Sequence, residues 1–248
     1  MRRRLRGRIF ENPKIMKPNP PQSSEAPLPG DRKKSSWSLV LKGFLAATVV
    51  MLLAGLTSPM VIRCRKKSDQ TEALNNARQI GLALSEFQQS YGSFPDARTK
   101  EEVRKNTGTD LKLGTKSSND FFRQLLAGEI AQSEAMFYAK GEGVRKPDNV
   151  FNGAKALAAR ECGFTYFLGA SITSNPKRPL LATPMIPGTD RFDPKPLEGM
   201  AVVLRMDNSV ASYKIDKDGH ILIDVRNLMD PHHPIWDGHA PVIAWPDL

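Results

Sequence analysis

The side chains best suited to chemistry lie near the end of this chain, where histidines and aspartates are interspersed. Five of them are potential ligands of zinc or another transition metal: His232, His233, His239, Asp230 and Asp237. Two of the histidines are adjacent and flanked by prolines, and the sequence has no His-Glu-x-x-His motif. We therefore expect a solvated loop and no metal site here. An exported hydrolase that uses this histidine-rich tail is kept as an alternative.

A second group of carboxylates surrounds a predicted hairpin. Asp207 lies in the sequence MDNS, and Asp216 and Asp218 lie in the sequence DKDG. Calcium requires oxygen ligands, but Gly219 comes too early for the spacing of an EF-hand. Because Asn-Ser and Asp-Gly pairs favour tight turns, these aspartates are explained as turn residues. Calcium remains the less favoured alternative for this group.

The two cysteines, Cys64 and Cys162, are far apart in the sequence. Two cysteines are too few for a disulfide scaffold or a cysteine-type zinc site, so we expect free thiols. No histidine is close to Cys162 in sequence, and there is no Gly-x-Ser-x-Gly elbow or phosphate-binding glycine loop. We therefore predict no catalytic residues, no cofactor and no enzymatic activity.

Positive charge is concentrated in the first quarter of the chain. Residues 1–67 carry a net charge of +12, whereas residues 68–248 carry a net charge of −2. A nucleic-acid-binding protein is expected to carry its basic patch on the folded domain. The observed distribution instead suits an anionic membrane surface, so we expect the lipid bilayer as a partner and no nucleic acid.

The basic segment contains an apolar run without charged residues, GFLAATVVMLLAGLTSPMVI, at 43–62. About 20 residues at about 1.5 Å each span roughly 30 Å, the thickness of the hydrocarbon core of a bilayer. We predict a transmembrane helix over 37–62, after a disordered, basic, proline-rich leader over 1–36. A buried core helix and a cleaved secretory signal are the alternatives. The arginines before the run favour a cytoplasmic N-terminus.

A second, amphipathic helix is predicted directly after the membrane segment, over 63–94. Its apolar residues are spaced alternately by four and three positions, which places them on one stripe of a helix. The stripe consists of Ala73, Ala77, Ile80, Leu84, Phe87 and Tyr91. Gly92 and Pro95 are typical of a helix C-terminus. We expect this stripe to pack on the sheet of an exported domain.

The exported domain, 95–248, is predicted to begin with short helices. The sequences EEVRKNTG at 101–108 and SNDFFRQLLAGEI at 118–130 favour helix, and Ser118 or Asn119 could cap the second one. A third candidate is NGAKALAARE at 152–161.

After Cys162 the sequence changes to short runs of strand composition, separated by Pro, Gly, Asn and Asp. These runs lie at 164–171, 178–186, 200–207, 209–216 and 220–225. We predict an α+β fold in which the amphipathic helix packs on a C-terminal antiparallel sheet of about four strands. The proline-rich tail should wrap the domain, with Trp236 and Trp245 as anchors.

The sequence resembles type IV pilin-like proteins, and in particular the pseudopilins of type II secretion and their planctomycete and verrucomicrobial relatives. The resemblance lies in KGF at 42–44, in the apolar run, and in RCRKKSDQTEALNNARQIGLALSEFQQSYGSFPD at 63–96. Near the C-terminus, AVVLRMDNSVASYKIDKDGH at 201–220 resembles the pair of strands that ends many of these proteins.

This resemblance implies a leader peptidase that cuts between Gly43 and Phe44 and a methylated new N-terminus. It also implies a single-pass structural protein of the bacterial inner membrane, with its C-terminal domain periplasmic or exported and with other pilin-like subunits as partners. The family normally has a glutamate at the fifth mature position, where it is thought to pair with a neighbouring subunit. Here that position is Thr48. The departure leaves open a membrane-tethered binding domain that no longer assembles.

Overall fold

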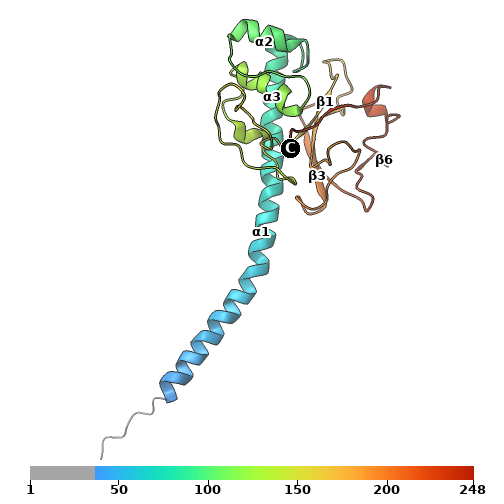
Figure 1. Ribbon diagram of the computed structural model, residues 1–248. Coiled ribbons are helices and arrows are strands. Elements are labelled where there is room, and N and C mark those ends of the chain that lie inside the picture. Colours follow the sequence, from blue (N-terminus) through green and yellow to red (C-terminus); the bar gives the residue numbers. More distant parts are fainter. Residues whose placement is uncertain (1–36) are drawn as a thin grey trace, which may run out of the picture. The chain divides into compact units, whose positions relative to one another are not determined.

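The computed structural model describes residues 37–248, without the side chains of residues 38, 39 and 52–66. The predicted leader, 1–36, lies outside the described residues. The chain divides into two units, Met1–Met51 and Leu52–Leu248. Helix α1, Trp37–Tyr91, begins in the first unit and ends in the second (Figure 1).

In the first unit, the described side chains of α1 are exposed although most of them are apolar. The large apolar ones are each at least 47% exposed: Trp37, Val40, Leu41, Phe44, Leu45, Val49, Val50 and Met51. Within the described residues, no helix is both long enough and apolar enough to cross a membrane. The predicted span at 43–62 falls only partly within that description, because the side chains of residues 52–62 lie outside it.

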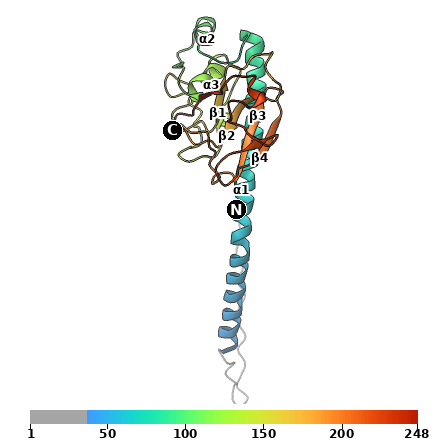
Figure 2. The same cartoon turned by 90° about the vertical axis from the view of Figure 1, so that its right-hand side faces the viewer.

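The second unit has the predicted α+β architecture, with helices packed on a five-stranded antiparallel sheet. The strand order is β4-β3-β2-β1-β7, and Figure 2 shows β1 to β4 side by side. The strands are β1 (Thr165–Leu168), β2 (Pro179–Thr183), β3 (Met200–Arg205), β4 (Val210–Lys214) and β7 (Val242–Ala244). A separate hairpin pairs β5 (Leu222–Ile223) with β6 (Arg226–Asn227).

The main sheet has one strand more than the four expected, and the additional strand comes from the tail. Four of the five predicted runs contain β1 to β4, whereas the run at 220–225 contributes to the small hairpin instead. β7 pairs with β1 at the edge of the sheet, with Ala244 opposite Tyr166. Three residues close to prolines at both ends are too few to show the alternation by which strands are predicted.

Two of the three short helices are present, as α2 (Thr99–Thr107) and α3 (Ser118–Ala127). Neither expected N-cap of α3, Ser118 or Asn119, is the capping residue. Ser117 caps the helix by accepting a hydrogen bond from the Asp120 N–H, and the Asp120 side chain accepts the Ser117 N–H in return. This reciprocal pair satisfies two N–H groups that have no partner within the helix.

The third predicted helix, at 152–161, is wrong. This segment is a succession of turns, and Gly153, Leu157 and Arg160 all have positive φ. A right-handed helix requires negative φ throughout. The apolar spacing here reflects burial of Ala156 and Leu157 in the core without helix formation.

The C-terminal part of α1 covers one face of the sheet. Five members of the predicted stripe have no exposed surface, and Tyr91 is partly buried. They share one core with sheet residues that point to the same face, which are Tyr166, Leu181, Val202 and Leu204. The helix ends at Tyr91, after which Gly92 adopts a φ of 75° and its N–H donates to the carbonyl of Gln88.

The opposite face of the sheet is buried by the C-terminal segments. Since neighbouring residues of a strand point to opposite faces, Phe167, Ala182 and Val203 belong to a second core. Trp236 from the tail fills this core, with its ring 5.2 Å from that of Phe167. Trp245 is partly buried against the same core. Both faces of the sheet are therefore covered.

Candidate functional site

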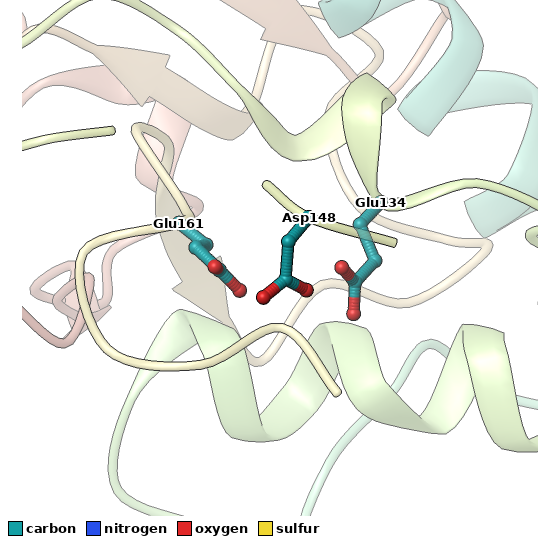
Figure 3. A group of neighbouring side chains, drawn as sticks. All are labelled: Glu134, Asp148 and Glu161. Atoms are coloured by element: carbon teal, nitrogen blue, oxygen red, sulfur yellow. The ribbon is translucent and has the colours of Figure 1, made fainter. Parts of the chain in front are cut away.

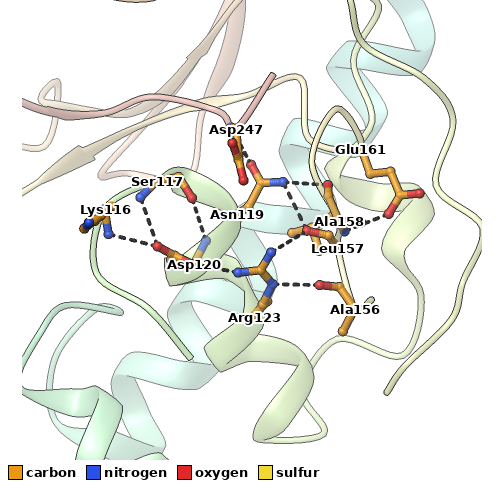
Figure 4. Close-up of polar contacts among 10 residues, drawn as sticks. All are labelled: Lys116, Ser117, Asn119, Asp120, Arg123, Ala156, Leu157, Ala158, Glu161 and Asp247. Carbon is orange, nitrogen blue, oxygen red and sulfur yellow. Dashed lines mark hydrogen bonds and ion pairs between the residues drawn. The ribbon is translucent and has the colours of Figure 1, made fainter. Parts of the chain in front are cut away.

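Side chains of α3 hold the irregular segment that precedes β1 (Figure 4). Arg123, only 6% exposed, donates to the carbonyls of Ala156 and Leu157 at 2.7 and 3.0 Å. Asn119, fully buried, donates to the carbonyls of Leu157 and Ala158 at 3.1 and 3.0 Å. Buried carbonyls need such partners where no helix or strand supplies them. The α3 side chains therefore fix the conformation of this segment.

The same segment presents backbone N–H groups to two buried glutamates. The Leu157 N–H donates to Glu134 Oε1 at 2.5 Å, and the Ala158 N–H donates to Glu161 Oε2 at 2.8 Å. Glu134 is the first residue of the short 3-10 helix η1, Glu134–Phe137. Neither glutamate has any exposed surface. Charged side chains are seldom fully buried unless they are paired, so both positions require an explanation.

Asp148 completes a cluster of three carboxylates with these glutamates. One oxygen of each side chain lies within 4.8 Å of the others, and Figure 3 shows the Asp148 carboxylate between those of Glu134 and Glu161. Asp148 is exposed, and its Oδ1 accepts the Val150 N–H at 3.0 Å. Within residues 37–248 as described, no second group of His, Cys, Asp and Glu meets the geometry of a metal site.

The cluster is short of positive charge. Glu134 Oε2 and Glu161 Oε1 are buried and accept no hydrogen bond within the described residues. The only cation close to these oxygens in the described structure is Arg145, whose Nη2 lies 2.9 Å from Glu161 Oε1. Burial raises the pKa of Glu134, and the charges of Glu161 and Asp148 raise it further, whereas the Leu157 N–H lowers it. Three neighbouring carboxylates are stable together only if a proton or a cation reduces their repulsion.

Sequence reasoning missed this cluster because its members are distant from one another and stand in no motif. Their oxygens are of the kind that hard divalent cations prefer. No protein-family model matches the chain, and the searches of curated proteins and of solved structures found no match to it. The chemistry of the cluster is therefore inferred from its geometry alone.

The aspartates of the predicted hairpin stabilise their own turns. Asp207 Oδ1 accepts the Ser209 N–H at 2.9 Å, and Asp216 Oδ1 accepts the N–H groups of Asp218 and His220 at 2.9 and 2.8 Å. Within the described residues the three aspartates do not form a group that could hold a metal. The turn interpretation accounts for their contacts.

The histidines of the tail also have structural surroundings. His233 is buried, its Nε2–H donates to the Ile223 carbonyl at 3.0 Å, and its Nδ1 accepts the Ile235 N–H. His232 and His239 are exposed. Asp230 Oδ1 accepts the His232 N–H and so closes a turn. The described structure does not bring these side chains together as metal ligands.

Cys162 is buried between α3 and the sheet. Its Sγ lies 3.6 Å from the Ser118 hydroxyl and 3.5 Å from the Phe164 carbonyl. Burial raises the pKa of the Cys162 thiol to about 11. A nucleophilic cysteine needs a lowered pKa and access to solvent, so this environment gives no support to catalysis. The side chain of Cys64 lies outside the described residues.

The residues of the predicted leader-peptidase junction, Gly43 and Phe44, both lie within α1. The hydroxyl of Thr48, which stands where the pilin-like family has glutamate, donates to the Phe44 carbonyl at 2.9 Å. Its only polar side-chain group is thus satisfied within its own helix.

Proposed function

We propose that this chain is a membrane-anchored structural subunit, a divergent relative of the pseudopilins, that acts by helix packing and not by catalysis. The proposal rests mainly on the exposed apolar side chains of Trp37–Met51. Soluble proteins rarely leave a large contiguous apolar surface uncovered, so lipid or another protein is expected to cover it. The basic residues on both sides of the apolar run suit a bilayer surface.

The second unit supports this proposal through the packing of α1. In the pilin-like arrangement that the sequence resemblance implies, the membrane helix continues into an amphipathic helix that lies on an antiparallel sheet. The stripe from Ala73 to Phe87 is buried on such a sheet. The β3–β4 hairpin, which carries the C-terminal resemblance, approaches α1 at Gly81, where a Cβ would collide with side chains of Leu204 and Asn208.

The surroundings of the reactive side chains favour a non-catalytic role. Cys162 has a raised pKa in a buried environment, and both ring nitrogens of His233 are occupied by backbone groups. In our proposal the N-terminus lies in the bacterial cytoplasm and the second unit is exported across the inner membrane. The partners are the bilayer and other pilin-like subunits.

Intact-mass analysis of the protein extracted from bacterial membranes tests this function. We expect a mature chain that begins with methylated Phe44. A Gly43→Leu variant should retain its leader, because the peptidase is expected to need a small residue there, whereas the control Gly55→Leu should be processed normally. A reporter fused after Leu248 should be exported. A cytosolic reporter, or a full-length chain that stays soluble without detergent, would refute membrane anchoring.

The hydrogen bond of Thr48 favours a second candidate, a membrane-tethered binding domain that does not assemble. A glutamate in hydrocarbon requires a partner, whereas a threonine that donates to Phe44 requires none. The mass analysis separates the two candidates. A membrane-bound chain that retains residues 1–43 would support the tether, and a processed chain would support the pilin-like route.

A further inference from the structure

We infer that Glu134, Asp148 and Glu161 form a binding site for a divalent cation of the calcium type. The site lies in the second unit, apart from the hairpin aspartates, and does not depend on membrane anchoring. Its three ligands come from η1, from the loop around Asp148 and from the segment before β1 (Figure 3).

The first support is the way in which the carboxylates are oriented. One oxygen of each side chain accepts a backbone N–H, from Leu157, Ala158 or Val150. These bonds hold the carboxylates in place. Within the described residues they leave Glu134 Oε2 without a donor, whereas Glu161 Oε1 also lies 2.9 Å from Arg145 Nη2. A preorganised set of oxygens loses less conformational entropy when a cation binds.

The second support is the unpartnered oxygen of Glu134. Glu134 has no exposed surface, and its Oε2 accepts no hydrogen bond within the described residues. Glu134 belongs to the group of three side chains that each have one oxygen within 4.8 Å of the others. A buried carboxylate oxygen without a partner is costly, whether or not its neighbours are also acidic. A cation bound among the three oxygens would remove this cost.

The balance of charge also fits a divalent ion. Arg145 contacts Glu161, but among the described residues neither of the other two carboxylates forms an ion pair. The next residue, Lys146, pairs with Glu72 of α1 instead. Two uncompensated negative charges match one divalent cation. Calcium suits this site better than magnesium, because calcium accepts irregular oxygen coordination, whereas magnesium requires a nearly ideal octahedron and gives up its water reluctantly.

The position of the cluster gives the cation a structural role. Residues 138–164 contain no helix or strand, and long segments of this kind need additional stabilisation within a compact domain. Asn76 of α1 donates a hydrogen bond to the carbonyl of Tyr138 at the start of this segment and another to the carbonyl of Ala135 in the preceding η1. A cation bound to Glu134, Asp148 and Glu161 would connect η1 with the middle and the end of this irregular segment.

The inference is tested by thermal unfolding of the full-length protein, purified in detergent and freed of metals with a chelator. At a calcium concentration a hundredfold above Kd, we expect the unfolding temperature to rise by about 5–10 °C. Sodium chloride at matched ionic strength should not produce this shift. No rise with calcium in the wild-type protein would overturn the inference and indicate that the carboxylates share a proton instead.

Two variants locate the effect. Glu134→Gln keeps an oxygen for the Leu157 N–H but removes the charge, so the calcium shift should disappear. Asp148→Asn provides a second test at an exposed position where folding is not at risk, and it should weaken calcium binding at least tenfold. The matched control Asp207→Asn should keep the full calcium shift. If both cluster variants retain the wild-type response, calcium binds elsewhere and the assignment is wrong.

Discussion

Two acidic groups in this chain resemble each other in composition and differ in almost everything else. The hairpin aspartates Asp207 and Asp216 lie in turns and accept backbone N–H groups from residues two to four positions later in the chain. The cluster of Glu134, Asp148 and Glu161 brings two buried carboxylates and one exposed carboxylate together from separate segments. An aspartate can stabilise a turn through residues close to it in sequence, whereas the carboxylates of the cluster come together only when the domain has folded.

The two groups also differ in the direction of their pKa shifts. Hydrogen bonds from the N–H groups of His220 and Asp218 lower the pKa of Asp216. Burial and neighbouring carboxylates raise the pKa of Glu134, although it too accepts a backbone N–H. Hydrogen bonding stabilises a carboxylate in both places, so desolvation and like charge decide the difference.

The largest effect is expected when the support of the buried cluster is removed. Arg123→Ala should lower the free energy of unfolding by about 3 kcal/mol, because it breaks a nearly buried ion pair with Asp120 and removes the donor of the Ala156 carbonyl. The Leu157 carbonyl loses one of its two donors and keeps Asn119. Urea unfolding in the presence of a chelator measures this loss. The control Arg104→Ala removes an exposed ion pair on α2 and should leave the midpoint unchanged. Equal effects would show that Arg123 does not organise this region.

Direct removal of one member from each group comes next. Glu161→Ala should cost about 2 kcal/mol, mainly because the Ala158 N–H loses its acceptor at a fully buried carboxylate. Loss of the ion pair with the exposed Arg145 should add little. Asp207→Ala should cost about 1 kcal/mol or less, because water can replace its side chain at the exposed Ser209 N–H. Chemical denaturation without calcium compares the two. If Asp207→Ala proved the more costly, the distinction between local and long-range acidic groups would fail.

The same distinction explains which features the sequence could predict. The stripe from Ala73 to Phe87, the runs that contain β1 to β4 and the hairpin turns are all local patterns, and the structure contains each of them. They follow from periodicity and turn chemistry within short windows.

The remaining features depend on contacts between distant segments. β7 is a strand because β1 presents a free edge to it, and its own three residues carry little signal. The segment at 152–161 has apolar spacing that suits a helix. Its carbonyls instead accept hydrogen bonds from the side chains of Asn119 and Arg123, and the segment forms a succession of turns. The cluster of Glu134, Asp148 and Glu161 becomes visible only when the fold is known.

A smaller effect is expected from the titration of Asp216. Its pKa is lower in the folded state than in the unfolded state, so its ionised side chain contributes stability above about pH 4. That contribution is lost as the pH falls through the folded-state pKa. The difference in urea midpoint between the wild-type protein and Asp216→Asn should therefore be constant at neutral pH and shrink in acid. A difference in urea midpoint that grew in acid would contradict a lowered pKa of Asp216 in the folded state.

The last comparison measures how accessible the two regions are to a thiol reagent. It uses a Cys64→Ser background, so that only the cysteine of interest reacts. Cys162 follows Glu161 directly and has no exposed surface, so it should react with an aromatic disulfide reagent far more slowly than a free thiol at pH 8. A cysteine introduced by Asp218→Cys, together with Cys162→Ser, should react at nearly the rate of a free thiol because that turn is exposed. Arg123→Ala should accelerate labelling of Cys162 and leave the turn cysteine unaffected. Similar rates at both positions would mean that the buried region opens as readily as the turn, and the carboxylates would then be solvated and need no cation.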